Sequence, residues 1–360
     1  MLRTDQLHID WPLMVGLLTL SFISLFVLYS AGGEDLGMVF RQVLRIIMAF
    51  AVMIAVAQVA PSSLMRWSPY LFIGGMILLL AVWGVGVIGK GAQRWLNLGL
   101  FQFQPAEIMK LAVPMTLAWL FTKHPLPPDL KVLGLAALLL GFPIILVLKQ
   151  PDLGTALMIA ASGLVVIFLA GMRWRLIGLL TLAAAAIAPL IWSHLHAYQQ
   201  KRITTLFDPW ADPLGSGYHT IQSTIAVGSG GIFGKGWLNG SQSQLEFIPE
   251  RSTDFIFAVF SEEFGLIGVS ILLAVYVFVV VRGIYIAYCA KDTYARLLAG
   301  GFALTFFFYI FVNIGMVSGV LPIVGVPLPL ISYGGTSMVT LMAAFGILMS
   351  IHTHRKLLSH

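Results

Sequence analysis

The chain is short of charge and has almost no cysteine. Asp, Glu, Lys and Arg make up 10% of its 360 residues, whereas a soluble domain carries about 25%. Hydrophobic residues make up 59% of the sequence. The single cysteine, Cys289, excludes an intrachain disulfide and a multi-cysteine metal site. This composition excludes an ordinary soluble domain and indicates a chain whose apolar surface faces lipid.

Several patterns of catalysis and nucleotide binding are also missing. The stretch Gly234-Lys235-Gly236 lacks the Ser or Thr of a Walker A loop, and no H-E-x-x-H zinc motif or G-x-S-x-G nucleophile elbow occurs. The net charge is +6, but the basic residues are scattered over many short segments. This distribution argues against nucleic acid as a partner and favours contact with anionic membrane lipid.

Long apolar runs account for most of the sequence. A membrane-spanning helix needs about 17–25 apolar residues, and the chain contains ten such runs. We therefore predict an all-α polytopic membrane protein with ten transmembrane helices, in which residues 1–360 form a single integral membrane domain. The predicted spans are 12–31, 43–60, 69–89, 106–122, 130–148, 153–171, 176–193, 262–281, 296–319 and 335–352.

The distribution of Lys and Arg sets the orientation of these spans. With the N-terminus inside, eleven basic residues fall in inside segments and five in short outside segments, as the positive-inside rule requires. Both termini are therefore predicted to be cytoplasmic. Residues 194–253 then form a long extracytoplasmic loop between spans 7 and 8. A loop of this length without structure would be unusual, so we expect short helices lying on the outer membrane surface.

A cluster of carboxylates follows this loop. Glu246, Glu250, Asp254, Glu262 and Glu263 fall within eighteen positions, and an ionisable group at membrane depth is a functional candidate by default. Asp254 is the candidate for chemistry, with a helix-start carboxylate as the alternative. If the stretch is helical, Glu262 lies about 12 Å deeper than Asp254. Glu262 and Glu263 are also compatible with a helix-packing pair or a proton path.

Other charges converge on the outer side in the predicted topology. Glu107 and Lys110 are spaced i, i+3 near the outer end of span 4, so they share a helix face and can pair. Lys149 and Asp152 lie where span 5 reaches that surface, and Arg94 lies in the preceding outer loop. The alternatives are a structural ion pair for the first two, and an interfacial lysine and a helix N-cap for the next two.

The segment from Asn313 to Ser337 cannot continue as a straight helix. It carries no charge, repeated glycines and three prolines, Pro322, Pro327 and Pro329. Irregular backbone at membrane depth is tolerated only where protein or a water-filled cavity covers it. We therefore predict a re-entrant, irregular segment before helix 10, beside a substrate cavity, with an ordinary outer connection as the alternative.

At these residues the sequence resembles the SEDS family, the membrane proteins of shape, elongation, division and sporulation. The segment from Asn313 to Ser337, with its Ser-Tyr-Gly-Gly-Thr-Ser end, is similar to the family signature. The likeness covers essentially the whole chain, and the loop at 236–244 resembles the elongation branch more than the division branch. Further matching segments are Gly91–Trp95, Gln104–Lys110, Lys149–Thr155 and Ile248–Ala258.

The resemblance implies a peptidoglycan glycosyltransferase that polymerises lipid II at the outer face of the bacterial plasma (inner) membrane during cell elongation. It also implies a complex with a class B penicillin-binding protein, the transpeptidase that crosslinks the new strands. The family's essential acidic residue corresponds to Asp254. Its conserved Glu and Lys of span 4 correspond to Glu107 and Lys110, and its Gln-Pro-Asp segment brings in Asp152.

This chemistry assigns hypothetical roles to the charged residues. Asp254 is the predicted general base, which deprotonates the acceptor hydroxyl, while Arg94, Lys110 and Arg202 face the diphosphates of lipid II and of the undecaprenyl-pyrophosphate-linked glycan. The sequence assigns no cofactor and no metal ligand, and it leaves open whether a divalent cation, Mg²⁺ or Mn²⁺, assists the reaction. The predicted substrate-binding residues are Arg94, Glu107, Lys110, Lys149, Asp152, Arg202, Glu262, Ser332 and Gly334.

Two other functions fit the same composition. A lipid II flippase also uses many spans, broken helices and intramembrane carboxylates. A scaffold that only recruits the penicillin-binding protein is the third reading. A transporter needs ionisable groups near the midplane with access from both sides, whereas the predicted charges gather outside. A scaffold has no need of buried charges.

Overall fold

The computed structural model of the chain describes residues 8–89, 92–97, 102–194, 197–245, 247–248 and 250–354. Ten long helices correspond to the ten predicted ranges, and the fold is that of an all-helical polytopic membrane protein. Their bounds are α1 (Trp11–Ala31), α2 (Leu36–Ala57), α3 (Pro61–Val85), α4 (Pro105–Thr122), α5 (Leu130–Lys149), α6 (Leu153–Leu169), α7 (Trp174–His194), α11 (Ile256–Tyr288), α12 (Thr293–Val317) and α13 (Thr336–Thr353).

Seven of these helices are long and apolar enough to cross a membrane, counting only described residues. The other three are α4, α6 and α7. α4 carries Glu107 and Lys110, and α6 has 17 residues. The chain is therefore a multi-pass membrane protein, and the count of ten spans stays a prediction.

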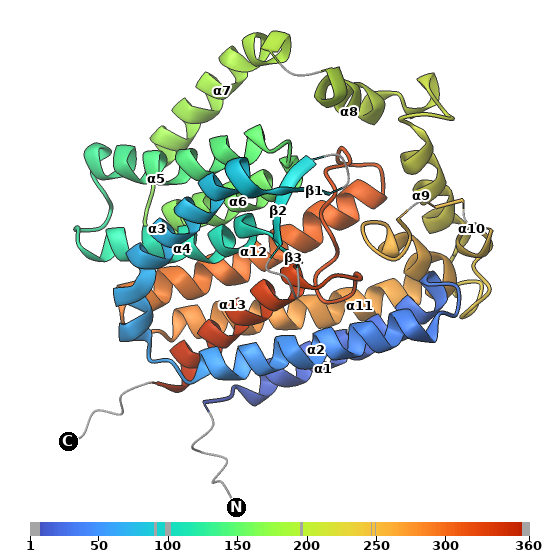
Figure 1. Cartoon of the computed structure of the whole chain (residues 1–360), viewed down its shortest axis with the longest axis horizontal. Coiled ribbons are helices and arrows are strands. Elements are labelled where there is room, and N and C mark those ends of the chain that lie inside the picture. The colour runs from blue at the N-terminus through green and yellow to red at the C-terminus, as the bar shows by residue number, and fades with distance from the viewer. Residues whose placement is uncertain are drawn as a thin grey trace, which may run out of the picture.

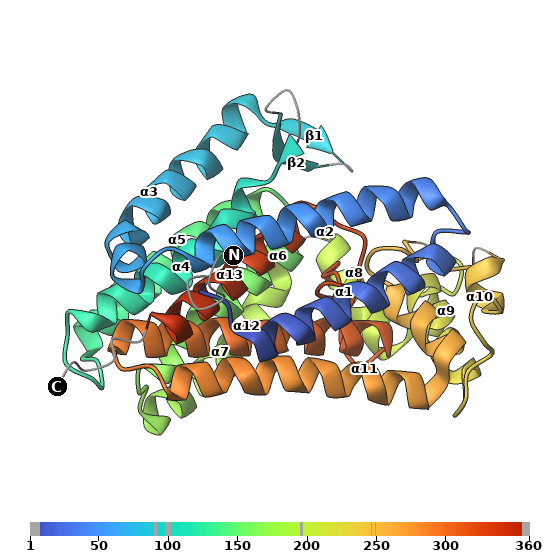
Figure 2. The same cartoon turned by 90° about the horizontal axis from the view of Figure 1, so that it is seen from below.

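The helices pack around α12, most of whose residues are buried. α12 contacts α11, α6 and α4, while α13 lies along α2 and α1 along α11. Figures 1 and 2 show this bundle, with α1 and α2 beside α13 and α11. α7 diverges from the bundle toward α8. The start of α1 and the end of α13 lie together, since Asp10 Oδ2 is 2.7 Å from His352 Nδ1.

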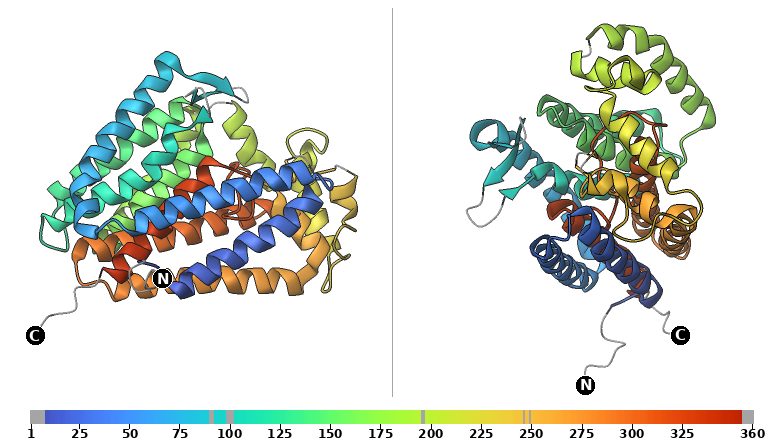
Figure 3. Two further views of the ribbon diagram at one scale, coloured as in Figure 1. Left: turned by 60° about the horizontal axis from the view of Figure 1, so that its bottom comes forward. Right: turned by 90° about the vertical axis from the view of Figure 1, so that its right-hand side faces the viewer.

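The predicted long loop contains short helices, as expected. They are α8 (Ala197–Phe207), the 3-10 helix η2 (Pro209–Ala211), α9 (Tyr218–Ser229) and α10 (Ser241–Gln244). Figure 3 shows the yellow part of this loop at the end of the bundle where α1 finishes.

Two local features differ from the prediction. α3 begins at Pro61 rather than near residue 69, and Pro69 lies inside it, because neighbouring helices can satisfy the backbone groups that an interior proline frees. Three short antiparallel strands, which the apolar pattern did not predict, connect α3 to α4. They are β1 (Val87–Gly89), β2 (Ala92–Asn97) and β3 (Gln102–Phe103).

The irregular segment before α13 is confirmed. Residues 318–335 contain no helix or strand, yet Val326, Leu328, Leu330 and Ile331 are buried. Buried backbone needs partners. The backbone N–H of Tyr333 donates to the carbonyl of Ser252 at 2.8 Å, and Asn313 of α12 donates to the carbonyl of Val326 at 2.7 Å, so the segment is fixed to the beginning of α11 and to α12.

Candidate active site

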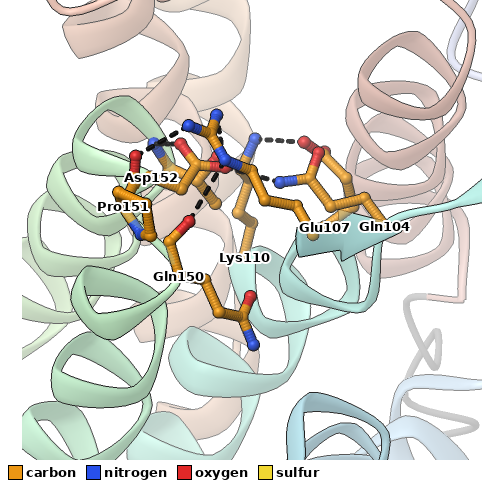
Figure 4. A network of polar contacts seen from close by, with 8 residues as sticks. Gln104, Glu107, Lys110, Gln150, Pro151 and Asp152 are labelled. Atoms are coloured by element: carbon orange, nitrogen blue, oxygen red, sulfur yellow. Dashed lines mark hydrogen bonds and ion pairs between the residues drawn. The ribbon is translucent and has the colours of Figure 1, made fainter. Parts of the chain in front are cut away.

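A polar cavity of about 250 Å³ lies where α4, α6, α12, α13, β2 and the irregular segment meet. Its charged lining residues are Arg94, Glu107, Lys110 and Asp152. The beginnings of α4 and α6 place three of these side chains at one level of the bundle (Figure 4). The structure thus brings together four of the residues that the sequence predicted for substrate binding.

Asp152 is the centre of the first contact network. Its carboxylate accepts a hydrogen bond from the backbone N–H of Thr155 at 3.1 Å, which makes it the predicted N-cap of α6. It also accepts one from Gln104 Nε2 at 2.6 Å. Arg94 approaches the same carboxylate at 3.7 Å and donates to the carbonyls of Gln150 and Pro151 at 3.2 and 2.7 Å. The guanidinium is thereby held at the cavity wall.

Glu107 and Lys110 form the predicted i, i+3 pair. Lys110 Nζ lies 2.6 Å from Glu107 Oε1, and both side chains are largely buried. The second carboxylate oxygen of Glu107 is buried with no hydrogen-bond partner. Lys110 Nζ also lies 5.5 Å from the ring centroid of Tyr309 on α12. A buried ammonium with one close carboxylate retains donor capacity for an anionic group of a ligand.

Asp254 lies beside this cavity, just before α11. A Cβ atom on Gly325 would be 3.3 Å from Asp254 Oδ2, and Gly325 lines the cavity. Gly325 has a φ of 73°, a backbone conformation that favours glycine. Asp254 is half-buried. The carboxylate therefore faces the segment that forms one wall of the cavity.

Hydrogen bonds from distant residues fix the position of Asp254. Asn313 Nδ2 donates to the carbonyl of Asp254 at 2.9 Å and to that of Val326 at 2.7 Å. The Ser332 hydroxyl donates to the carbonyl of Thr253 at 2.6 Å and accepts from the backbone N–H of Leu328 at 2.8 Å. Ser332 thus supports the backbone around Asp254, while Gly334 lines the cavity itself.

Five predicted residues lie outside the cavity lining: Asp254 and Ser332 are beside it, and the other three are elsewhere. Lys149 is exposed at the end of α5. Arg202, on α8, lines a separate cavity of about 130 Å³ together with Lys201, Leu321 and Pro322. Glu262 is completely buried and pairs with Lys235 at 2.7 Å. The three residues therefore belong to three other places in the fold.

The predicted depth of Glu262, about 12 Å beyond Asp254, assumed one continuous helix through both residues. The structure does not have such a helix. α11 begins at Ile256 and is broken at Gly265, whose φ is 61°. The break frees the carbonyls of Glu262 and Glu263, which accept from the N–H groups of Lys235 and Gly236 at 3.0 Å. Glu246 of the carboxylate cluster, Pro249 of the segment Ile248–Ala258 and Gly91 of the segment Gly91–Trp95 lie outside the described residues.

Sequence reasoning missed several residues of the site. Gln104 lies in the matching segment Gln104–Lys110 but has no predicted role. Its amide side chain, directly before an apolar helix, is a signal that could have identified it. Asn313 was likewise noted only as part of a signature. Arg45 lies 4.2 Å from the ring centroid of Tyr333, and its Nε lies 3.6 Å from where a Cβ on Gly335 would be. Nothing in the sequence pattern indicates the position of Arg45 or Tyr309.

The described residues contain no group of three or more His, Cys, Asp or Glu side chains arranged to hold a metal. The two carboxylates of the cavity, Glu107 and Asp152, each have a cation within 4 Å. Assistance by a divalent cation stays a prediction.

Comparisons with known proteins agree on one family. Residues 7–357 match the FtsW/RodA/SpoVE family of cell cycle proteins. The chain is 54% identical to the peptidoglycan glycosyltransferase MrdB of Escherichia coli K12 over 99% of its length and 96% of that protein. It is 35% identical to the stage V sporulation protein E of Bacillus subtilis, over 99% and 100% of the two chains.

Solved structures show the same fold. A chain from a peptidoglycan synthase complex that coordinates polymerization and crosslinking superposes with a TM-score of 0.84 at 34% identity, covering 97% of this chain and 98% of that one. The rod shape determining protein RodA of Thermus thermophilus superposes with a TM-score of 0.73 at 29% identity, covering 96% and 97%. The chain therefore belongs to the FtsW/RodA/SpoVE family, the SEDS family that its motifs predicted.

Proposed function

We propose that this chain is a peptidoglycan glycosyltransferase that polymerises lipid II at the outer face of the bacterial inner membrane. The observation that carries the proposal is the position of the Asp254 carboxylate next to Gly325, a residue that lines the same cavity as Arg94 and Lys110. A glycosyl transfer from a lipid diphosphate needs a base and cations in this relation. The 54% identity to a peptidoglycan glycosyltransferase supports the same reaction.

The proposed step is an inverting displacement. The 4-hydroxyl of the acceptor GlcNAc transfers its proton to the Asp254 carboxylate as its oxygen attacks the anomeric carbon of the donor. The bond between that carbon and the diphosphate oxygen breaks, and undecaprenyl diphosphate leaves with the bonding electrons. Arg94 and Lys110 line the cavity and oppose the charge that develops on this leaving group.

Two cationic cavities suit a reaction between two lipid-linked substrates. The smaller one holds Arg202 and shares its wall, at Leu321 and Pro322, with the irregular segment. The larger one is bounded by a later part of the same segment, at Gly325 and Gly334. We therefore keep the role predicted for Arg202 from the sequence and assign it to the diphosphate of the second lipid-linked substrate.

The remaining predicted residues receive more limited roles. Glu107 orients Lys110, Asp152 holds Arg94, and Ser332 fixes the backbone before Asp254. Gly334 lines the cavity. Glu262 anchors the loop through Lys235 instead of touching substrate, and Lys149 contacts the membrane surface.

The comparisons and the topology support three further proposals. The family match over residues 7–357 supports one integral membrane unit. The peptidoglycan synthase complex among the structural neighbours supports assembly with a class B penicillin-binding protein. The likeness to a rod shape determining protein supports a role in elongation. The distribution of Lys and Arg supports both termini being cytoplasmic and the cavity lying on the outer side.

The test is an assay of lipid II conversion to glycan, resolved on a gel, using the full chain with and without its penicillin-binding protein. Moenomycin is included to silence contaminating glycosyltransferases of other families. Wild-type polymer that is lost in a folded Asp254→Asn variant supports both the reaction and the base. Equal polymer from the two proteins removes Asp254 from the chemistry. Absence of polymer from both, with the partner present, favours the flippase.

A further inference from the structure

A further hollow, separate from the two cavities described above and lined by basic residues, lies between the beginnings of α5 and α7. Its volume is about 660 Å³. It is lined by three cations, one carboxylate, one proline and four leucines, and we call it the basic hollow. The lining residues are Lys131, Arg173, Arg175, Asp129, Pro128, Leu130, Leu133, Leu176 and Leu179.

The basic hollow lies at the opposite end of the helices from the cavity. α5 has 20 residues and ends at Lys149, next to Gln150 and Asp152 of the cavity network. At 1.5 Å per residue its two ends are roughly 30 Å apart, about the thickness of the hydrocarbon core. The basic hollow is therefore at the other membrane surface, which the orientation rule assigns to the cytoplasm.

Positive charge is in excess there. Lys131, Arg173 and Arg175 are exposed, and the structure places no ion-pair partner for them among the residues it describes. Asp129 is the single carboxylate among the lining residues, so three positive charges less one negative charge leave +2. Such a surface attracts phosphate groups.

The walls of the basic hollow are apolar and open toward the lipid region. Leu130 on α5 is 75% exposed and Leu179 on α7 is 63% exposed. α7 packs only marginally against other elements of the described chain and diverges from the bundle, as Figure 1 shows. Trp174, 78% exposed, lies between the two arginines, where an aromatic ring is typical of a membrane interface.

We propose that the basic hollow binds an anionic phospholipid of the bilayer. Its phosphates contact Lys131, Arg173 and Arg175, and its acyl chains lie along the leucines between α5 and α7. The net charge of +2 fits a lipid with two phosphates, such as cardiolipin, better than a lipid with one. A soluble anion would leave the leucines bare, whereas an acyl chain covers them. This site is independent of the proposed transferase reaction.

The test is native mass spectrometry of the purified full chain in detergent, titrated with cardiolipin, phosphatidylglycerol or phosphatidylcholine. We expect wild-type affinity to fall in that order. The variant Lys131→Gln/Arg173→Gln/Arg175→Gln should lose on the order of 100-fold in apparent affinity for cardiolipin, because each of the three cations near an anionic lipid contributes about fivefold. Binding of phosphatidylcholine should not change.

The matched control variant is Arg66→Gln/Lys291→Gln/Arg296→Gln. It also removes three cations from the predicted cytoplasmic side, but none of them lines the basic hollow. It should lose less than about threefold, and an equal loss in both variants would reduce the site to diffuse attraction. If the wild-type chain binds all three lipids equally, the proposal is overturned, and a protein partner becomes the alternative occupant of the basic hollow. Folding is checked by gel filtration, and the single variants Arg173→Gln and Arg175→Gln, each expected to lose about threefold or more, serve if the triple variant does not fold.

Discussion

The buried ion pair between Lys235 and Glu262 allows a quantitative test of how the outer loop is held on α11. The Glu262 side chain is fully buried, and its Oε1 lies 2.7 Å from Lys235 Nζ. The same oxygen accepts from the backbone N–H of Gln242 at 3.0 Å and from the Ser241 hydroxyl at 3.1 Å. These donors all come from the loop, as does the Ser229 hydroxyl, which donates to the same oxygen at 3.5 Å. One carboxylate therefore ties together residues before, within and after the stretch Gly234-Lys235-Gly236.

Removing only the cation should be the most damaging change. Breaking a buried pair typically costs 3–5 kcal/mol, because the remaining charge is left uncompensated. The Lys235 side chain is 30% exposed, and three donors to Glu262 remain, from Ser229, Ser241 and Gln242. We therefore expect Lys235→Met to cost about 2–3 kcal/mol of unfolding free energy. Glu262→Gln keeps the shape and should cost about 1–2 kcal/mol.

The double variant distinguishes this reasoning from simple loss of contacts. Adding Glu262→Gln to Lys235→Met removes the stranded charge, so the double variant should be more stable than Lys235→Met alone, which requires a coupling of about 2–3 kcal/mol between the two substitutions. The measurement is a reversible denaturant titration in mixed micelles. Lys201→Met is the control, because its 2.9 Å pair with Asp212 is exposed and should contribute less than about 1 kcal/mol. Additive losses, or equal losses for the two lysines, would refute the argument.

Three further predictions concern other parts of the fold. If Lys110 and Glu107 act as one unit, Lys110→Met, Glu107→Gln and the double variant should lose polymer formation to the same extent; additive losses contradict this. Gly154→Ala should lower the unfolding free energy by about 1–3 kcal/mol, because the added Cβ would lie 2.6 Å from the carbonyl oxygen of Val324. Gly141→Ala is the control, since its added Cβ meets open space and should not lower the thermal unfolding midpoint. Burial alone would raise the pKa of the Asp10 carboxyl, but hydrogen bonds from His352, Arg282 and the backbone N–H of Leu13 outweigh this effect and hold the pKa well below 3.8. It therefore stabilises the fold above about pH 4, and the loss of this contribution on acidification should be absent from Asp10→Asn.

Local patterns were sufficient for the helices and for contacts within one helix turn. Apolar run length located the ten long helices, and the i, i+3 spacing predicted the pair that Lys110 and Glu107 form at 2.6 Å. The N-cap role of Asp152 also follows from its position before an apolar run. Each of these depends on residues within a few positions of one another, which is the range over which sequence periodicity carries information.

Features that depend on tertiary partners were not predicted. The break of α11 at Gly265 is tolerated because the N–H groups of Leu266 and Ile267 donate to the carbonyls of Gly231 and Ile232, at 2.9 and 3.1 Å. A glycine in an apolar run does not reveal that a loop some thirty residues earlier supplies these acceptors. The same holds for Gln104, whose role depends on a carboxylate 48 residues away.

The position of Asp254 shows why the candidate site needed the structure. The backbone that carries this carboxylate is held by Asn313, 59 positions away, and by Ser332, which reaches the carbonyl of Thr253 across 79 positions. These two side chains also fix Val326 and Leu328 of the irregular segment. The segment and the acidic residue are therefore positioned by the same hydrogen bonds. A substitution that moves one should move the other, which explains how an uncharged, glycine- and proline-rich stretch can matter to acid–base chemistry.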